Sequence, residues 1–222
     1  GALVNAYGFG PEKPLAEMDA KTIDSLLRIT GFQRVSLLDN GTVVKENKGI
    51  YFDFNAIAKG YTVDALATML VSLGYENFLV EVGGELFAAG INPEKETSWR
   101  VAVDHPKEQE TRAFIATLTL QNQGLASSGN YRKFRTDASG NRYVHTINPK
   151  TGQTVQSNVL STSVLAHSTM LADAYATALM ALPYEKGKAL IDSLTDVEAM
   201  WVLAVKDSVE VKATEKFEFK LR

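Results

Sequence analysis

The segment NFLVEVGGELFAA, residues 77–89, joins two short β-type runs through a pair of glycines. Its valine, leucine and phenylalanine side chains suit the pleated, half-buried surface of a strand. Gly83 and Gly84 interrupt the pattern, so we expect one strand over residues 77–82 and a second over residues 85–89. The glycines are compatible with a β-bulge, with close approach of a ligand or backbone, or with a tight turn.

The sequence on either side of this segment alternates further β-type runs with helical patterns. A hairpin is expected over residues 34–45 around Asp39-Asn40-Gly41. The remaining strands are expected over residues 49–54, 99–103, 112–120, 143–147, 159–166 and within 197–221, and helices over 15–30, 61–73, 169–182 and 184–194. Because no clean βαβαβ alternation occurs, we predict an α+β fold, one domain over residues 1–222 with mostly antiparallel sheets and packed helices.

One of these helices shows an apolar side that we expect to be buried. In residues 61–73 that side is made of Val63, Leu66, Met69, Leu70 and Leu73.

Composition excludes several classes of function. The chain has 222 residues, a formal charge of −3 and no cysteine, which excludes disulfides, zinc ribbons, thiolate catalysis and iron–sulfur ligation. The mildly acidic balance argues against nucleic-acid binding. No apolar run reaches the ~18–20 residues that a transmembrane helix needs. The chain starts without Met in an ordered-looking segment, GALVNAYGFGPEKP, so we expect it to be cut from something longer.

Residues 51–61 have a layout that suits anion binding. A β-type run, small residues and then a helix start would offer free backbone N–H groups to an anion, and Lys59 lies close to that helix start. Asp53 sits among aromatic residues and needs a partner if it is buried. The alternative is that Asp53 caps a turn and Lys59 is solvated.

Two further segments carry candidate polar groups. Ser128 and Gly129, in LASSGNY, suit a phosphate cradle, although the P-loop spacing is absent and a surface loop is the favoured explanation. His145 stands at the end of a β-type run, before the turn Asn-Pro-Lys-Thr-Gly. This position suits a general base, because histidine changes charge near neutral pH. A structural histidine is the alternative.

The segment STMLADAYATALM, residues 168–180, predicts a helix that is apolar nearly all round and therefore buried. Asp173 and Thr177 are four residues apart, which places both oxygens on one face. A buried carboxylate needs a cation or several donors, and Mg²⁺ prefers such oxygen ligands. Alternatively, Asp173 interacts with the helix N-terminal dipole while Ser168 caps the helix.

Taken together and in order, these segments resemble the ApbE family, the FAD:protein FMN transferases. The matching pieces cover most of residues 1–182; they are GALVNAYGFGP, DFNAIAKGYTVDALA, FLVEVGGELFAAG, SSGNYRKF, YVHTINPKTGQTV and STSVLAHSTMLADAYATALMAL.

The resemblance implies an ApbE-type, T-fold-like domain that lacks its N-terminal portion here, and with it part of the FAD pocket. It implies an enzyme that cleaves FAD with Mg²⁺, transfers FMN to a Thr or Ser hydroxyl of a target protein, and releases AMP. Family targets include subunits of sodium-pumping NADH:quinone reductase and related redox complexes. Family members act in the periplasm, often as lipoproteins associated with the inner membrane.

Residue roles implied by the resemblance follow the matching motifs. The metal ligands would be Asp173, Thr177 and the backbone carbonyl of Ala56. Ala176 stands where some members carry a second Asp, so this chain lacks one carboxylate for a second metal. His145 would be the base. The FAD contacts would fall at Asp53, Lys59 and Ile147, with Ser128 and Gly129 near the cofactor.

Two alternatives share all these motifs. One is a metal-dependent FAD pyrophosphatase that gives FMN and AMP. The other is a non-catalytic periplasmic protein that binds intact FAD.

Overall fold

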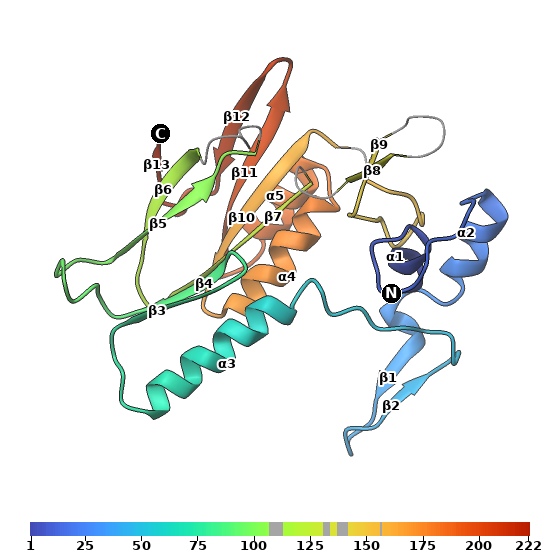
Figure 1. The fold of residues 1–222 in the computed structure, drawn as a ribbon, viewed down its shortest axis with the longest axis horizontal. Coiled ribbons are helices and arrows are strands. Elements are labelled where there is room, and N and C mark those ends of the chain that lie inside the picture. Colours follow the sequence, from blue (N-terminus) through green and yellow to red (C-terminus); the bar gives the residue numbers. More distant parts are fainter. Residues whose placement is uncertain (107–112, 131–133, 137–141, 156) are drawn as a thin grey trace. The chain divides into compact units, whose positions relative to one another are not determined.

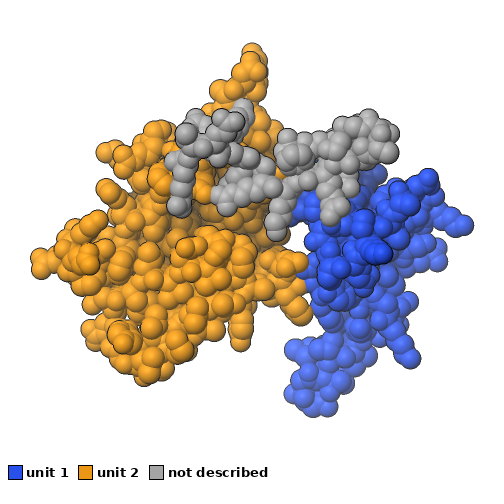
Figure 2. Space-filling view, viewed as in Figure 1, with its two compact units in different colours: residues 1–53, 133–156 blue, residues 54–132, 157–222 orange. Residues whose placement is uncertain are grey.

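The computed structural model describes residues 1–106, 113–130, 134–136, 142–155 and 157–222. The chain separates into two compact units, coloured blue and orange in Figure 2. Unit 1 comprises residues 1–53 and 133–156, and unit 2 comprises residues 54–132 and 157–222. Each unit therefore combines two separate segments of the sequence. The assignment of residues 1–222 to one domain stays a prediction.

Unit 1 consists of short elements. Its helices are α1 (Ala2–Ala6), α2 (Ala20–Leu27) and the 3-10 helix η1 (Phe32–Arg34). Two antiparallel pairs of strands complete it: β1 (Val35–Leu37) with β2 (Val43–Lys45), and β8 (Phe134–Thr136) with β9 (Arg142–Val144). The expected hairpin around Asp39-Asn40-Gly41 is confirmed by the first pair.

Two predictions for unit 1 were wrong. The helix expected over residues 15–30 begins only after Asp19, because this side chain accepts the N–H of Thr22 at 2.8 Å and caps α2. The strand expected over residues 49–54 does not form. Tyr51, Phe52 and Phe54 belong to residue types that favour strands, but they are exposed and lie outside every described sheet.

Unit 2 contains the larger sheet, whose order is β12-β11-β10-β7-β4-β3 with antiparallel pairing throughout. A second antiparallel sheet has the order β13-β6-β5. The strands are β3 (Phe78–Val82), β4 (Glu85–Ala89), β5 (Trp99–Asp104), β6 (Phe114–Leu120), β7 (Gln123–Gly129), β10 (Val159–Ala166), β11 (Glu198–Val205), β12 (Ser208–Ala213) and β13 (Lys220–Leu221). The helices are α3 (Ala58–Ser72), α4 (Thr169–Met180) and α5 (Tyr184–Asp192).

Both faces of the six-stranded sheet are covered, so unit 2 has three layers (Figure 1). Helices α4 and α5 pack on one face around Trp201, which is fully buried. The three-stranded sheet packs on the other face through Leu118 and Leu120. Successive residues of β7 point to opposite faces, so Ala126 contacts the helical layer and Leu125 the second sheet. These layers confirm the predicted α+β class with antiparallel sheets.

Gly83 and Gly84 form the tight turn between β3 and β4. Val82 pairs with Glu85, which leaves a loop of the two glycines, and both have positive φ, 62° and 104°. Two-residue hairpin loops with both residues at positive φ match the twist of their strands and strongly favour glycine. The predicted bounds of β4 and the predicted end of β3 are confirmed, and β3 begins one residue later than expected, at Phe78.

The buried side of α3 differs from the expected one. Gly60, Val63 and Ala67 are buried, whereas Met69 and Leu73 are 49% and 65% exposed. Small residues on the buried side allow α3 to approach its neighbours closely. The prediction was therefore right for Val63 and in part for Leu70, which packs against a buried cluster, and wrong for Leu66, Met69 and Leu73.

The interpretation of residues 125–131 as a surface loop is also wrong for residues 125–129. Residues 123–129 form β7 between β4 and β10, and Leu125 and Ala126 are buried. Tyr131 lies outside the described residues. Among the helices that the structure describes, none has both the length and the hydrophobicity needed to cross a membrane.

Candidate functional site

The N-terminal ends of α3 and α4 are joined by reciprocal hydrogen bonds within unit 2. The Gly60 N–H donates to Oδ2 of Asp173 at 3.1 Å. In return, the two carboxylate oxygens of Asp64 accept the N–H groups of Thr169 and Met170 at 2.7 and 2.9 Å. N–H groups in the first turn of a helix have no partner inside the helix. Each helix therefore supplies the carboxylate that satisfies the start of the other.

The structure tests one part of the two interpretations of the α4 start, and the role of Asp173 as a cation ligand stays a prediction. Ser168 caps α4 as expected, since its hydroxyl accepts the Leu171 N–H at 3.1 Å. Asp173, however, lies in the second turn of α4 and interacts with the N-terminus of α3 instead of its own helix. A negative charge is favourable at either helix start, because the N-terminal N–H groups carry partial positive charge.

Two glycines allow this close packing. A Cβ on Gly60 would lie 2.4 Å from the carbonyl oxygen of Thr169 and 2.6 Å from Cα of Met170. A Cβ on Gly124 of β7 would meet the Thr169 backbone at 2.7 Å. Since these neighbours are backbone atoms, no rotamer change relieves the overlap.

Gly60→Ala is therefore expected to lower the free energy of unfolding by about 2 kcal/mol, because overpacking outweighs the gain in helix propensity. Chemical denaturation followed by circular dichroism measures this change. Gly187→Ala in α5 is the matched control, since its Cβ would meet only side-chain atoms, the nearest being Cδ2 of Leu179 at 3.0 Å. If both variants lost equal stability, backbone contact at Gly60 would not be the cause.

Asp173 is a buried carboxylate with an unusual environment. It is 2% exposed, and burial raises its pKa, while the Gly60 hydrogen bond and the charge of Lys59 act in the opposite direction. Thr177 follows one turn later, and its hydroxyl lies 3.2 Å from that of Ser128 on β7. The predicted face with Asp173 and Thr177 therefore exists, and Ser128 belongs to the same group of side chains.

Lys59 is paired with a carboxylate that sequence reasoning did not select. Its Nζ lies 2.5 Å from Oε2 of Glu85, whose side chain is 1% exposed, while the Lys59 side chain itself is 45% exposed, so Lys59 is both paired and partly solvated. Burial raises the pKa of Glu85, Lys59 opposes this, and Asp173 adds to the rise. A Cβ on Gly83 would lie 3.2 Å from Cδ of Lys59, so the glycine turn leaves room for the lysine stem.

Ala56 lies in the turn that precedes α3. The residue before a helix supplies the first acceptor of its ladder; here it is Ile57, which accepts the Tyr61 N–H at 2.8 Å. The Ala56 carbonyl therefore precedes the first acceptor of that ladder. Its role as a metal ligand beside Asp173 and Thr177 stays a prediction.

These donors fit a hard cation. Among the described residues no group of three or more His, Cys, Asp and Glu is arranged as a metal site. One carboxylate with neutral oxygens suits Mg²⁺, which usually keeps several waters and takes one or two carboxylates plus substrate phosphate.

The other three predicted residues belong to unit 1. His145 directly follows β9, as expected for a strand end, and its ring meets that of Phe9 edge-on at 6.1 Å. Ile147 bridges to Thr154 across the Asn-Pro-Lys-Thr-Gly turn. Asp53 is half-buried in an extended segment. The roles of all three stay predictions.

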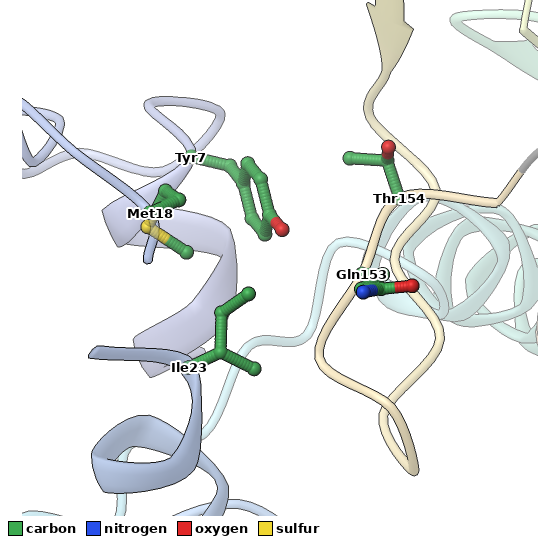
Figure 3. Close-up of a pocket in the computed structure, with 5 residues that line it drawn as sticks. All are labelled: Tyr7, Met18, Ile23, Gln153 and Thr154. Carbon is green, nitrogen blue, oxygen red and sulfur yellow. The ribbon is translucent and has the colours of Figure 1, made fainter. Parts of the chain in front are cut away.

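Unit 1 also contains a cavity of about 530 Å³, shown in Figure 3. Tyr7, Met18 and Ile23 line one side and Gln153 and Thr154 the other. The Tyr7 hydroxyl donates to the carbonyl of Gly152 at 3.0 Å, which ties the first segment of the unit to the second. None of the predicted site residues is among these lining residues.

Comparison with known proteins identifies the family. The model of the ApbE family matches residues 1–201. The chain belongs to the ApbE family. The FAD:protein FMN transferase of Vibrio cholerae is 34% identical over 218 residues, and the enzyme of that name from Escherichia coli K12 is 34% identical over 195 residues. These alignments cover 98% and 86% of this chain but only 64% and 55% of the relatives.

Solved ApbE structures share the fold. The flavin transferase ApbE from Vibrio cholerae superposes with a TM-score of 0.85 at 32% identity and covers 98% of this chain and 68% of that one. The apo flavinyl transferase ApbE from Pseudomonas stutzeri gives 0.84 at 34% identity, with 97% and 66% covered. The chain thus has the ApbE fold over nearly its whole length and spans about two thirds of each of these solved proteins.

Asp64 and Glu85 are the charged residues that sequence reasoning missed. Each had a signal. Asp64 follows Gly60 by one helical turn, on the side of α3 that carries the small residues. Glu85 opens a strand that is otherwise apolar, ELFAA. A charged residue in such a position is buried only with a partner.

Proposed function

We propose that this ApbE chain is part of a Mg²⁺-dependent flavin transferase. The enzyme cleaves the pyrophosphate of FAD, attaches FMN to a Thr or Ser hydroxyl of a target protein, and releases AMP. The family assignment and the names of the relatives support this reaction. The single observation that carries it is the buried Asp173, held at the N-terminus of α3 with Thr177 one turn away.

Asp173, Thr177 and the Ala56 carbonyl would hold the metal. When bound, Mg²⁺ would offset the charge of the pyrophosphate and of the transition state. Lys59 adds a half-exposed ammonium group to the same unit, anchored on Glu85. The N–H groups at the start of α3 favour an anion at this helix end.

His145 would act as the general base. A Thr hydroxyl is a poor nucleophile until a base removes its proton. In the proposed reaction the His145 imidazole takes that proton, the hydroxyl oxygen forms a bond to the FMN-side phosphorus, and the bond from that phosphorus to the bridging oxygen breaks. AMP leaves with that oxygen. The edge contact with Phe9 restricts the orientation of the imidazole ring.

Incubation with FAD, Mg²⁺ and an acceptor domain tests the reaction. Flavin fluorescence that stays with the acceptor band in a denaturing gel, together with AMP, is the expected result. Free FMN and AMP without a fluorescent band would identify a pyrophosphatase instead. Intact FAD after long incubation would identify a binding protein. The acceptor with its target Thr replaced by Val is the control.

We also propose a setting for this reaction on the basis of the family resemblance. The acceptor would be a subunit of a sodium-pumping NADH:quinone reductase or a related redox complex. The whole protein would act in the periplasm as a lipoprotein at the inner membrane. Fractionation of cells that express the full-length protein would test this, and recovery in the cytoplasm would contradict it.

A further inference from the structure

Lys59 is paired with the buried carboxylate of Glu85, and the next residue, Gly60, donates its N–H to a second buried carboxylate, that of Asp173. The Lys59 Nζ is 2.5 Å from Glu85, whereas no ion pair with Asp173 occurs within the described residues of unit 2, although Lys59 lowers the pKa of Asp173 through its charge. The lysine stem passes over Gly83, whose missing Cβ leaves the space. Lys59 is therefore fixed at both its stem and its tip.

Without Glu85, Asp173 would be the remaining buried carboxylate near this ammonium group. The side chain of lysine is a flexible four-carbon stem, so its ammonium group can pair readily with a nearby carboxylate. A Lys59–Asp173 pair would occupy the oxygens that a divalent cation needs, since a ligating carboxylate must be free of a competing cation.

We propose that Glu85 is a positioning residue that holds Lys59 away from Asp173 and so keeps Asp173 available to a divalent cation. This inference rests on the proposed metal site but not on flavin transfer. It gives the pair of buried Glu85 and half-exposed Lys59 a role in cation binding, because Glu85 keeps a competing ammonium group away from Asp173.

Binding of Mn²⁺ to the full chain, read by electron paramagnetic resonance of the free ion, tests the proposal without FAD. Glu85→Gln is expected to bind Mn²⁺ about fivefold more weakly. This factor in the dissociation constant corresponds to the energy of one solvent-accessible ion pair. Lys59→Met should bind Mn²⁺ at least as tightly as the natural chain. The double variant Lys59→Met/Glu85→Gln should regain the natural affinity, because the competitor is gone.

Glu81→Gln is the matched control. Glu81 lies on the same hairpin, is exposed, and accepts the Gly84 N–H at 2.7 Å, so its loss removes one negative charge without releasing Lys59. Equal weakening in Glu81→Gln and Glu85→Gln would mean that net charge alone acts, and would overturn the proposal. So would unchanged affinity in folded Glu85→Gln, or a double variant as weak as the single one.

Loss of folding in Glu85→Gln, detected by circular dichroism, would leave Lys59→Met to decide. Weaker Mn²⁺ binding by that variant would show that Lys59 supports the cation, which contradicts the proposal. Tight Mn²⁺ binding without any flavin transfer would uphold this inference and refute only the proposed reaction.

Discussion

Asp173→Ala is expected to lose flavin transfer and Mg²⁺ dependence together. Loss of outer-shell support alone lowers metal affinity or activity by about 10–100-fold, so loss of a direct carboxylate ligand should lower transfer at least about 100-fold. The measurement is the rate of AMP release across a Mg²⁺ titration, with chelation of the metal in the natural protein as reference. A variant that keeps full Mg²⁺ dependence would exclude Asp173 as a ligand.

Asp173→Asn separates the two roles of this side chain. The amide oxygen still accepts the Gly60 N–H, whereas the negative charge is lost. We expect the Asn variant to be as inactive as the Ala variant but closer to the natural protein in thermal stability, because the Gly60 N–H keeps an acceptor. Activity in the Asn variant would show that the hydrogen bond to α3, and not the charge, is what matters.

His145→Ala is expected to bind FAD with natural affinity and to transfer flavin about 100- to 10,000-fold more slowly, the range typical of general base catalysis. FAD binding by fluorescence quenching and transfer by in-gel fluorescence measure the two effects separately.

His105→Ala serves as control for the second prediction. His105 follows β5, and its backbone N–H donates to the carbonyl of Ala113 at 2.8 Å, a bond that the substitution keeps. No role in the reaction is proposed for it. Normal flavin transfer by His145→Ala would remove the base assignment, and weak FAD binding by the same variant would turn His145 into a binding residue.

The parts of the fold that follow from local chemistry were predictable. The β3–β4 hairpin depends on two adjacent glycines, and the start of α4 depends on Ser168, so a short window of sequence contains the cause. The buried side of α3 was not predictable in this way, because helix α3 is apolar on both sides. Its choice is made by the close approach of Gly60 to the backbone of α4.

The candidate site also combines features set by the local sequence with features set by tertiary packing. The spacing of Asp173 and Thr177 placed both on one face of α4, which is a property of any helix. The partners of these groups come from distant positions: Gly60 meets Asp173 across 113 residues, and Asp64 meets Thr169 across 105. Such pairs depend on tertiary packing, so Asp64 and Glu85 became recognisable as buried partners only in the folded chain.

The exchange of carboxylates between α3 and α4 has a consequence for motion. Neither helix can fray at its N-terminus alone, because unwinding of either first turn also exposes the charged group that the other provides. Local opening in this region is therefore cooperative, and its free energy is shared by two helices instead of one. The residues proposed to receive the cation thus lie where unit 2 resists partial unfolding.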